Sequence, residues 1–354
     1  MQSSYNENDV QILLKDITGL VEPLSADVRE KKIQTGTPYS EMLPLEYKPT
    51  PKYMEAYQYA LTSYAEATAD AIGVLAEKLY QKKGDSLTLV SLARAGIPIG
   101  ILIKRYLRNK YRVEVDHYAI SIIRGKGIDK NAVNYILERK PSASIQFVDG
   151  WVGKGAILSQ LKEALHDYPS VDKELGVVSD PANLTDLCGT HDDILIPSSC
   201  LNATVTGLIS RTFFRADIIG KHDFHGAAYH TELENEDLSE AFLSAIESHF
   251  SYRTMGKDSA VARAGTTGID VVRKIQTEYA VKDINFIKPG IGEATRVLLR
   301  RIPWKIIVNS DFENAAELQH IYQLSNEKNV AVEISRVPLH NYKVCGIIKA
   351  MSDI

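Results

Sequence analysis

The chain has 354 residues, of which 44% are hydrophobic and 24% are charged, and its 41 basic and 45 acidic residues give a net charge of −4. This length leaves room for two or three domains with a sizeable core. The small negative charge excludes a polycation that binds nucleic acid over its whole surface, so any nucleic-acid-binding face has to be local.

The cysteines and the apolar runs indicate the compartment. Cys188, Cys200 and Cys345 are odd in number and widely spaced, which argues against a disulfide framework and for reducing surroundings. No apolar run approaches the ~18 residues of a membrane span, and the N-terminal residues lack an export pattern. We therefore expect a cytoplasmic protein with no membrane partner.

Residues 1–50 predict an N-terminal arm. The segment "TGTPYSEMLPLEYKPTPKYM" concentrates prolines, which are excluded from helix interiors and from central strands. We expect this segment to run extended along a neighbouring domain. Good helix formers with apolar residues at helical spacing then predict one long helix over Tyr53–Lys82.

From residue 87 onward, segments with a strand pattern alternate with segments of helical pattern. This alternation predicts an α/β domain at residues 51–255 whose strands pair in parallel through right-handed crossovers. Ligands of such sheets bind beyond the carboxyl ends of the strands, so the turns after the strands are candidate sites. The expected strands are Leu87–Leu92, Val113–Ile123, Ile145–Val148, Leu175–Val178 and Ile194–Ile196, and the expected helices are Ile97–Arg108, Ala156–Leu165 and Leu201–Phe214.

The first two turns carry basic residues. Arg94 ends a strand, and Gly96 precedes a helix whose free N–H groups and dipole favour an anion. A glycine-broken segment, "IIRGKGIDKNAV", follows the next strand and places Arg124 and Lys126 where they could close over a ligand. An ordinary strand–helix connection is the alternative for the first turn.

The stretch "IQFVDGWVGKGAILSQL", residues 145–161, combines a strand, a glycine-rich turn and a helix. It is not a P-loop, which has four residues between its first glycine and Gly-Lys, and it is not a dinucleotide-binding fingerprint. Its backbone amides could still surround one phosphate while the aspartate reaches sugar hydroxyls. The residues concerned are Asp149, Gly150, Gly153, Lys154, Gly155 and Ala156.

In this order, the basic turn, the basic segment and the aspartate-headed glycine turn resemble type I phosphoribosyltransferases. The resemblance implies that Arg94 and Gly96 contact pyrophosphate and that Arg124 and Lys126 form a hood over it. It also implies that the Asp149 turn holds the ribose and 5-phosphate of phosphoribosyl pyrophosphate, with Mg²⁺ as cofactor. The sequence departs from that family because Gly150 replaces a second acid, and Gly153, Lys154 and Ala156 stand in place of Thr and Gly.

A cysteine and several histidines indicate a second chemistry. Cys200 follows Ile194–Ile196 where a helix is expected to begin, and a helix N-terminus lowers the pKa of a thiol. With His225 as base, Cys200 would form the Cys–His pair of a hydrolase. The alternative is that Cys200 is a small buried apolar residue and Ser199 a helix cap. The histidines at 222, 225 and 230 are a weak zinc signal, so no metal is assigned to them.

A second, smaller α/β domain is predicted over residues 284–354, after a linker at residues 256–283 that contains a helix at Ile269–Tyr279. Its start, "KPGIGEATRVLLRR", resembles the RNA-binding L7Ae fold in its Pelota-like form. Two of its arginines are four residues apart on one helical face, although a glycine stands where kink-turn binders carry asparagine. A solvated helix face is the alternative. The resemblance implies RNA contacts at Gly290, Gly292, Glu293, Thr295, Arg296 and Arg300.

Over residues 30–252 the chain resembles one bacterial family through "SLARAGIPIG", "FVDGWVGKGAI", "PSSCLNATVTGLISRT" and "DFHGAA". Members of this family accompany tellurium-resistance and stress genes, and they are described both as phosphoribosyltransferase-like and as StiP-type cysteine proteases.

Three hypotheses follow from these patterns. The leading one is a phosphoribosyltransferase-like protein that binds phosphoribosyl pyrophosphate or a nucleotide-like ligand and transfers or processes a ribosyl phosphate in a stress response. The first alternative is a cysteine protease with Cys200 as nucleophile and His225 as base. The second alternative is an RNA-binding adaptor without catalysis. The oligomeric state stays open, and a homodimer is one option.

Overall fold

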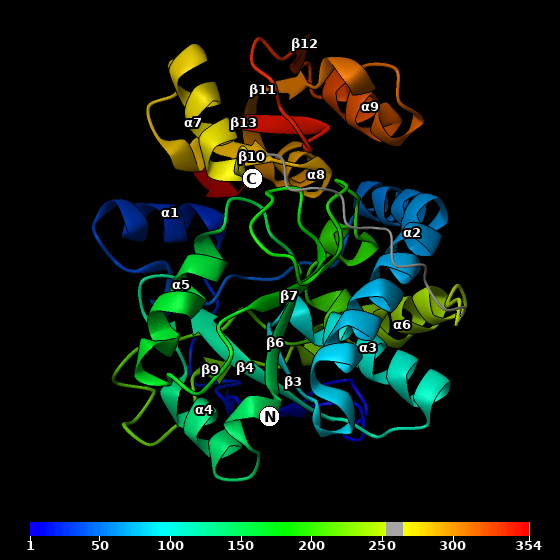
Figure 1. Cartoon of the computed structure of the whole chain (residues 1–354). Coiled ribbons are helices and arrows are strands. Elements are labelled where there is room, and N and C mark those ends of the chain that lie inside the picture. Colours follow the sequence, from blue (N-terminus) through cyan, green and yellow to red (C-terminus); the bar gives the residue numbers. More distant parts are fainter. Residues whose placement is uncertain (253–264, 354) are drawn as a thin grey trace.

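The computed structural model describes residues 1–252 and 265–353, which form two α/β units (Figure 1). The larger unit contains a seven-stranded sheet, and the smaller unit, formed by residues after 265, contains a four-stranded sheet. Figure 1 shows the smaller unit stacked on one end of the larger one. Of the linker expected at residues 256–283, residues 256–264 lie outside the described residues.

The larger sheet runs in the order β1-β4-β3-β6-β7-β8, and neighbours along this path are parallel. The predicted parallel sheet is therefore confirmed. Only β5, which pairs with β4, is antiparallel among the described strands of this sheet. The bounds are β1 Gln11–Ile12, β3 Thr88–Ala93, β4 Asp116–Ile123, β5 Gly127–Ile128, β6 Ile145–Trp151, β7 Leu175–Ser179 and β8 Cys188–Thr190.

Helices cover both faces of the sheet, because the central strands are apolar on both sides. α2, α3 and α6 share one hydrophobic cluster, with Leu75, Leu102 and Leu243 among its members. α4 and α5 share the cluster of the opposite face, with Val133 and Leu161. None of the described helices is both long and apolar enough to span a membrane. The bounds are α2 Pro51–Lys83, α3 Gly96–Tyr111, α4 Lys130–Leu137, α5 Ala156–Ala164 and α6 Ser239–Glu247.

The first fifty residues are built into the larger unit. Strand β1 extends the main sheet beside β4, and β2 (Lys15–Asp16) pairs with β9 (Gly226–Ala227). Helix α1 (Ala26–Gln34) follows, and residues 45–50 then run without regular structure to the start of α2. Only this last stretch keeps the extended course that its prolines predict.

Two predicted elements are wrong. Ile194–Ile196 forms no strand, and β8 is the edge strand of the sheet instead. Residues 201–214 form no α-helix, because the backbone turns through positive φ at Gly207 (72°) and Leu208 (57°), which a right-handed helix does not contain. A short 3-10 helix, Pro197–Cys200, precedes this stretch. Cys200 therefore ends a 3-10 turn and does not lie at the N-terminus of an α-helix, where a dipole would lower the pKa of its thiol.

The smaller unit has the strand order β10-β13-β11-β12. β11 and β12 are parallel, whereas β13 is antiparallel to both of its neighbours. The helix predicted at Ile269–Tyr279 is confirmed as α7 (Gly268–Glu278), and a capping box of Thr267 and Asp270 starts it. The other bounds are α8 Ile291–Arg300, α9 Gln319–Glu327, β10 Ile287–Pro289, β11 Arg301–Val308, β12 Ala331–Ile334 and β13 Val344–Asp353.

A buried carboxylate joins the two units. Asp193, in the loop after β8, is 3% exposed and accepts hydrogen bonds from the backbone N–H groups of Ile291 (2.9 and 3.1 Å) and Lys343 (3.0 Å). Ile291 is the first residue of α8, so the carboxylate satisfies a free N–H group at the positive end of that helix. Gly290 allows this approach, because a Cβ there would lie 3.1 Å from Asp193 Oδ1.

Replacing Asp193 with Ala is expected to lower the free energy of unfolding by roughly 2–4 kcal/mol, because two buried N–H groups lose their acceptor. Urea unfolding of the full chain measures this change. Asp192→Ala is the matched control: Asp192 is exposed and its carboxylate pairs with Lys343, so the expected loss is below about 1 kcal/mol. Equal losses for the two variants would show that Asp193 does not hold the units together.

Candidate functional site

A cleft separates the carboxyl edge of the larger sheet from helix α8. Its central cavity, of about 400 Å³, is lined by the ends of β3 and β6, by α8, and by Ser198, Ser199, Leu201 and Asn202. Adjoining cavities of about 280 and 260 Å³ are lined by the glycine turn and by residues 44–50, respectively. The cavities form one continuous cleft, because they share lining residues such as Asp149, Lys288 and Arg300.

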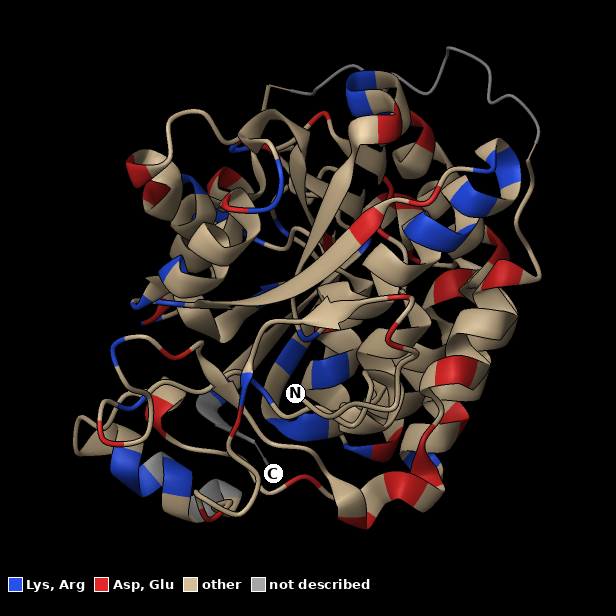
Figure 2. Cartoon of the chain, turned by 90° about the horizontal axis from the view of Figure 1, so that it is seen from below, with Lys and Arg blue, Asp and Glu red and all other residues tan. Residues whose placement is uncertain are grey.

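Basic side chains from both units line this cleft. The acidic side chains among its described lining residues are Glu46, Asp149 and Glu293, so positive charge is in excess. On the face drawn in Figure 2, by contrast, the two signs are interspersed. A partly closed space with excess positive charge favours an anionic ligand. The larger unit contributes Arg94, Arg124, Lys154 and Arg211, and the smaller unit contributes Lys288, Arg296, Arg300 and Arg301.

The positive charge of the cleft is held at an energetic cost. Burial, helped by the nearby Lys288, lowers the pKa of Lys154 to about 8. Burial and neighbouring cations also lower the pKa of Lys288 and of Arg300. Although burial opposes it, Arg296 and Lys288 hold the pKa of Glu293 below its usual range. An anion that enters the cleft would offset this cost.

Asp149 lies in the central cavity at the end of β6. Its Oδ1 accepts a hydrogen bond from the N–H of Gly150 at 2.8 Å. Helix α3 begins close beside it, because a Cβ on Gly96 would lie 2.9 Å from the carbonyl oxygen of Val148. Gly96 thus serves the approach of α3 to β6. Burial raises the pKa of Asp149 to about 7, so this carboxyl group can hold or release a proton near neutral pH.

The glycine turn forms as predicted and is held by the smaller unit. Gly155 has a φ of 87° and precedes α5. Lys154 Nζ donates to two carbonyl oxygens of the smaller unit at 2.9 and 3.1 Å, and the Tyr342 hydroxyl donates to the Gly153 carbonyl oxygen at 2.5 Å. The ammonium of Lys154 therefore fixes the turn to the smaller unit. Gly153, Lys154, Gly155 and Ala156 line the adjoining cavity.

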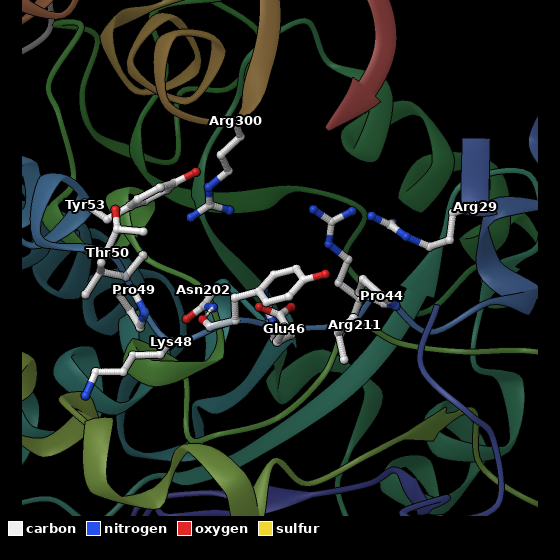
Figure 3. Close-up of a pocket in the computed structure, with 14 residues that line it drawn as sticks. Arg29, Pro44, Glu46, Lys48, Pro49, Thr50, Tyr53, Asn202, Arg211 and Arg300 are labelled. Carbon is white, nitrogen blue, oxygen red and sulfur yellow. Dashed lines mark hydrogen bonds and ion pairs between the residues drawn. The ribbon is translucent and has the colours of Figure 1, made fainter. Parts of the chain in front are cut away.

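Arg94 is paired within the protein. Its Nη1 lies 2.9 Å from Glu46 Oε1 and donates to the Ile209 carbonyl oxygen at 2.9 Å. Burial opposes ionisation of Glu46, but Arg94 and His230 hold the pKa of its carboxyl group below the usual range. Figure 3 shows Glu46 in the cavity of the N-terminal arm, with Arg300 pointing into it from α8. A carboxylate of the protein thus occupies one end of the cleft.

The predicted hood is a tight turn between β4 and β5. Its Arg124 donates to Asn285 Oδ1 at 3.2 Å and lines the cavity of the glycine turn. Lys126 instead lies 3.4 Å from Glu41 of the N-terminal segment. Of the two basic residues expected to cover a ligand, the structure brings only Arg124 to the described lining of the cleft.

Cys200 and His225 have separate surroundings. Cys200 is fully buried, and burial raises the pKa of its thiol to about 12, with only partial compensation from Arg300. The ring of His225 lies 2.9 Å from Ser121 Oγ and packs against Phe214. Among the contacts of the described residues, none joins Cys200 to a histidine. The structure therefore does not assemble the predicted pair.

The residues expected to contact RNA lie at the junction of the two units. Arg300 donates to the Cys200 carbonyl oxygen at 3.2 Å, and Arg296 pairs with Glu293 at 3.0 Å. Thr295 is buried and bonds to His320. None of the six residues, Gly290, Gly292, Glu293, Thr295, Arg296 and Arg300, belongs to the exposed class.

A different cysteine has a histidine beside it. Cys188 Sγ lies 3.4 Å from His191 Nε2, and His191 Nδ1 lies 3.0 Å from the carbonyl oxygen and 3.7 Å from Oδ2 of Asp180. A carbonyl oxygen only accepts, so Nδ1 is assigned as the donor to it, and in the tautomer with this proton Nε2 is the acceptor that faces the thiol. Sequence reasoning missed this pair, although a cysteine and a histidine three residues apart in "CGTH", residues 188–191, were a usable signal.

The residues of the cleft do not form a metal-binding cluster. The described parts of the chain contain no group of three or more His, Cys, Asp or Glu side chains placed to hold a metal ion. At the glycine turn Asp149 stands alone, because Gly150 supplies no second carboxylate. A Mg²⁺ ion prefers several oxygen ligands, so these residues do not fit it as a resident cofactor.

Comparison with known proteins shows similarity to two family models and to a named relative. A family model described as "Tellurite-like stress resistance cysteine protease StiP" matches residues 3–247, and one described as "PELOTA RNA binding domain" matches residues 266–350. A protein named "Cysteine protease StiP" from Acinetobacter baylyi is 34% identical over 341 residues, which cover 91% of this chain and 88% of the relative.

The Asp149→Asn variant is expected to be more stable than the wild type, by a margin that grows as pH rises. The folded pKa of Asp149, about 7, exceeds the ordinary value of 3.8, so the folded state retains a proton that the unfolded state releases between those values. Rising pH through this window therefore destabilises the wild type but not the variant. The melting temperatures should diverge between about pH 4 and pH 7 and stay apart above it, whereas parallel curves would contradict the raised pKa. Asp116→Asn tests the same exchange at an exposed position.

Proposed function

The chain belongs to the StiP family, and on this premise we propose that it is a cysteine-dependent hydrolase with Cys188 as its nucleophile. His191 is the general base, and Asp180 orients its ring. The proposal is carried by the 3.4 Å distance between Cys188 Sγ and His191 Nε2. A nucleophile within hydrogen-bonding reach of a base that a third group orients is the usual arrangement in covalent catalysis.

The tautomer of His191 suits the first step. Nε2 takes the thiol proton, and the thiolate attacks the carbonyl carbon of the scissile bond. The imidazolium then gives that proton to the leaving amine as the carbon–nitrogen bond breaks, which leaves a thioester. In the second step His191 deprotonates water, the hydroxide attacks the thioester, and the proton returns to the sulfur as the carboxylic acid leaves.

Cys200 supports this chemistry less well than Cys188. Burial raises the pKa of the Cys200 thiol to about 12, and the charged groups near it, Arg300 and Arg296, stay protonated and cannot accept its proton. Cys188 is also buried, at 1% exposure, while the side chain of His191 is 10% exposed. We therefore place the approach of the substrate on the His191 side. A peptide as substrate follows the name of the relative and is part of the proposal.

Cys188→Ser is expected to reduce hydrolysis of an unfolded protein substrate such as casein at least about 100-fold, because the nucleophile is lost, and His191→Ala should act similarly. Iodoacetamide, followed by mass spectrometry, should label Cys188 faster than Cys200 or Cys345 near neutral pH. All three thiols are buried, so Cys200→Ser and Cys345→Ser are matched controls that retain activity. Loss of activity in Cys200→Ser with retention in Cys188→Ser would move the nucleophile to Cys200.

We propose binding of a phosphorylated ribose, in particular phosphoribosyl pyrophosphate, as a second candidate function, because Asp149 and the glycine turn face basic side chains across the cleft. Asp149 would accept hydrogen bonds from the ribose hydroxyls, while Lys288 and Arg124 would face its phosphates. Two expected contacts are already engaged within the protein, since Arg94 pairs with Glu46 and Lys154 holds the glycine turn. Neither the family descriptions nor the relative's name mentions a phosphoribosyltransferase.

Calorimetric titration with phosphoribosyl pyrophosphate tests the second candidate, with Mg²⁺ added only as the counterion of the ligand. We expect Asp149→Asn to weaken binding about tenfold, because a charged acceptor is lost, and Asp116→Asn to leave it unchanged. Absence of binding by the wild type, or equal binding by both variants, would remove the ribose site from the cleft.

A further inference from the structure

Charged side chains of helix α8 line a cavity, and those of Arg296 and Glu293 keep 29% and 24% of their surface exposed there. Glu293, Arg296 and Arg300 line the central cavity, and the bonds of Asp193 hold the first turn of the helix against the larger unit. The cavity, at about 400 Å³, has the size of a small-molecule site, which a double helix cannot enter. A nucleotide, or the end of a single strand, is small enough to reach these side chains inside the cavity.

The charge of the cavity favours a terminal phosphate over an internal one. A phosphate monoester carries close to two negative charges near neutral pH, whereas a phosphodiester carries one. Lys288, Arg296 and Arg301 line the cavity together, and burial and mutual repulsion lower the pKa of Lys288. The monoester thus relieves more repulsion than any internal phosphate of the same strand.

Two further groups suit a nucleoside. Trp151 lines the central cavity, the cavity of the glycine turn and a smaller cavity that Asp193 also lines. Its aromatic ring is a surface on which a base can stack. Ser199 is 9% exposed, and its hydroxyl oxygen, buried in the cavity wall, has no hydrogen-bond partner among the residues that the structure describes. A buried hydroxyl without a partner costs free energy, so it marks a place for a polar group of a ligand.

We infer that the cleft binds a nucleotide with a terminal phosphate monoester, either free or at the end of a single-stranded RNA, with the phosphate at Lys288 and Arg296 and the base on Trp151. The C-terminal unit, which matches an RNA-binding family, would thus present an RNA end to the larger unit. The inference rests on the second candidate function only for the location of the ligand, and it is independent of the hydrolase proposal.

Tryptophan fluorescence of the full chain tests this inference. Trp304 is exposed on the outside of the smaller unit, so Trp304→Phe leaves Trp151 as the reporter of the cleft. The probes are AMP and oligoadenylates that carry a 5′-phosphate, a 3′-phosphate or no terminal phosphate. We expect at least one phosphorylated probe to quench Trp151 and to bind about tenfold more tightly than the oligomer without terminal phosphate.

Two variants and two controls locate the binding. Arg296→Gln and Lys288→Gln should each weaken the phosphorylated probe about tenfold, and neither side chain holds a backbone group in the described contacts. Arg336→Gln and Lys282→Gln, on the exposed surface of the same unit, should leave binding unchanged. Unchanged melting temperatures of all four variants would show that they fold.

Each outcome decides the inference. Cleft-dependent binding of AMP alone assigns the site to a free nucleotide, and tighter binding of a phosphorylated oligomer assigns it to an RNA end. Binding that ignores the terminal phosphate and weakens in Arg336→Gln would overturn the inference and place RNA on the outer surface. Absence of binding by every probe would also overturn it. If phosphoribosyl pyrophosphate fails while a nucleotide binds, the ribose-phosphate function falls and the nucleotide site stands.

Discussion

The attachment of helix α8 to Asp193 is the constraint on which the cleft depends. One buried carboxylate accepts the N–H of Ile291 at the start of α8 and the N–H of Lys343 before β13, so it fixes two elements of the smaller unit at once. With the first turn of α8 held there, the arginines of the following turns lie over the carboxyl edge of the parallel sheet. That edge is where open α/β sheets place their ligands. The ligand-binding edge that open α/β sheets share is thus covered here by a helix of the smaller unit.

The electrostatics of the cleft follow from this junction. Each unit alone would expose its basic side chains to water, where they repel one another little. Together they enclose cations from both sides, and the pKa of Lys154 falls to about 8. The protein compensates part of this charge with Glu46, which the N-terminal arm places beside Arg94. The remaining excess, the raised pKa of Asp149 and the unpartnered hydroxyl of Ser199 all mark the same region as one prepared for a ligand.

Sequence patterns predicted the larger sheet and much of the cleft, but not the sides of the cleft that the segment after Cys200 and helix α8 form. The strands around Asp149, the glycine turn and α2 were predictable, because local periodicity and glycine positions determine them. Residues 201–214 were not, because apolar side chains at near-helical spacing there fill the core of an irregular segment whose course is set by tertiary packing. The Cys188–His191 pair was missed because it depends on how β8 ends, and the helix expected to begin at Cys200 does not form. That α8 faces inward depends on Asp193, almost a hundred residues away.

Strand β13 gives the cleft an order of assembly. It lies between β10 and β11 in the smaller sheet, and the residues just before it, Tyr342 and Lys343, bond to the glycine turn and to Asp193. The ribosome makes these residues after every other part of the cleft. The carboxyl edge of the larger sheet therefore stays open to solvent while the nascent chain is shorter than this. Helix α8 can be held over that edge only after translation has passed Tyr342 and Lys343. A chain that stopped before Tyr342 would keep the strands of the larger sheet but lose the bonds to the glycine turn and to Asp193, and with them the enclosure.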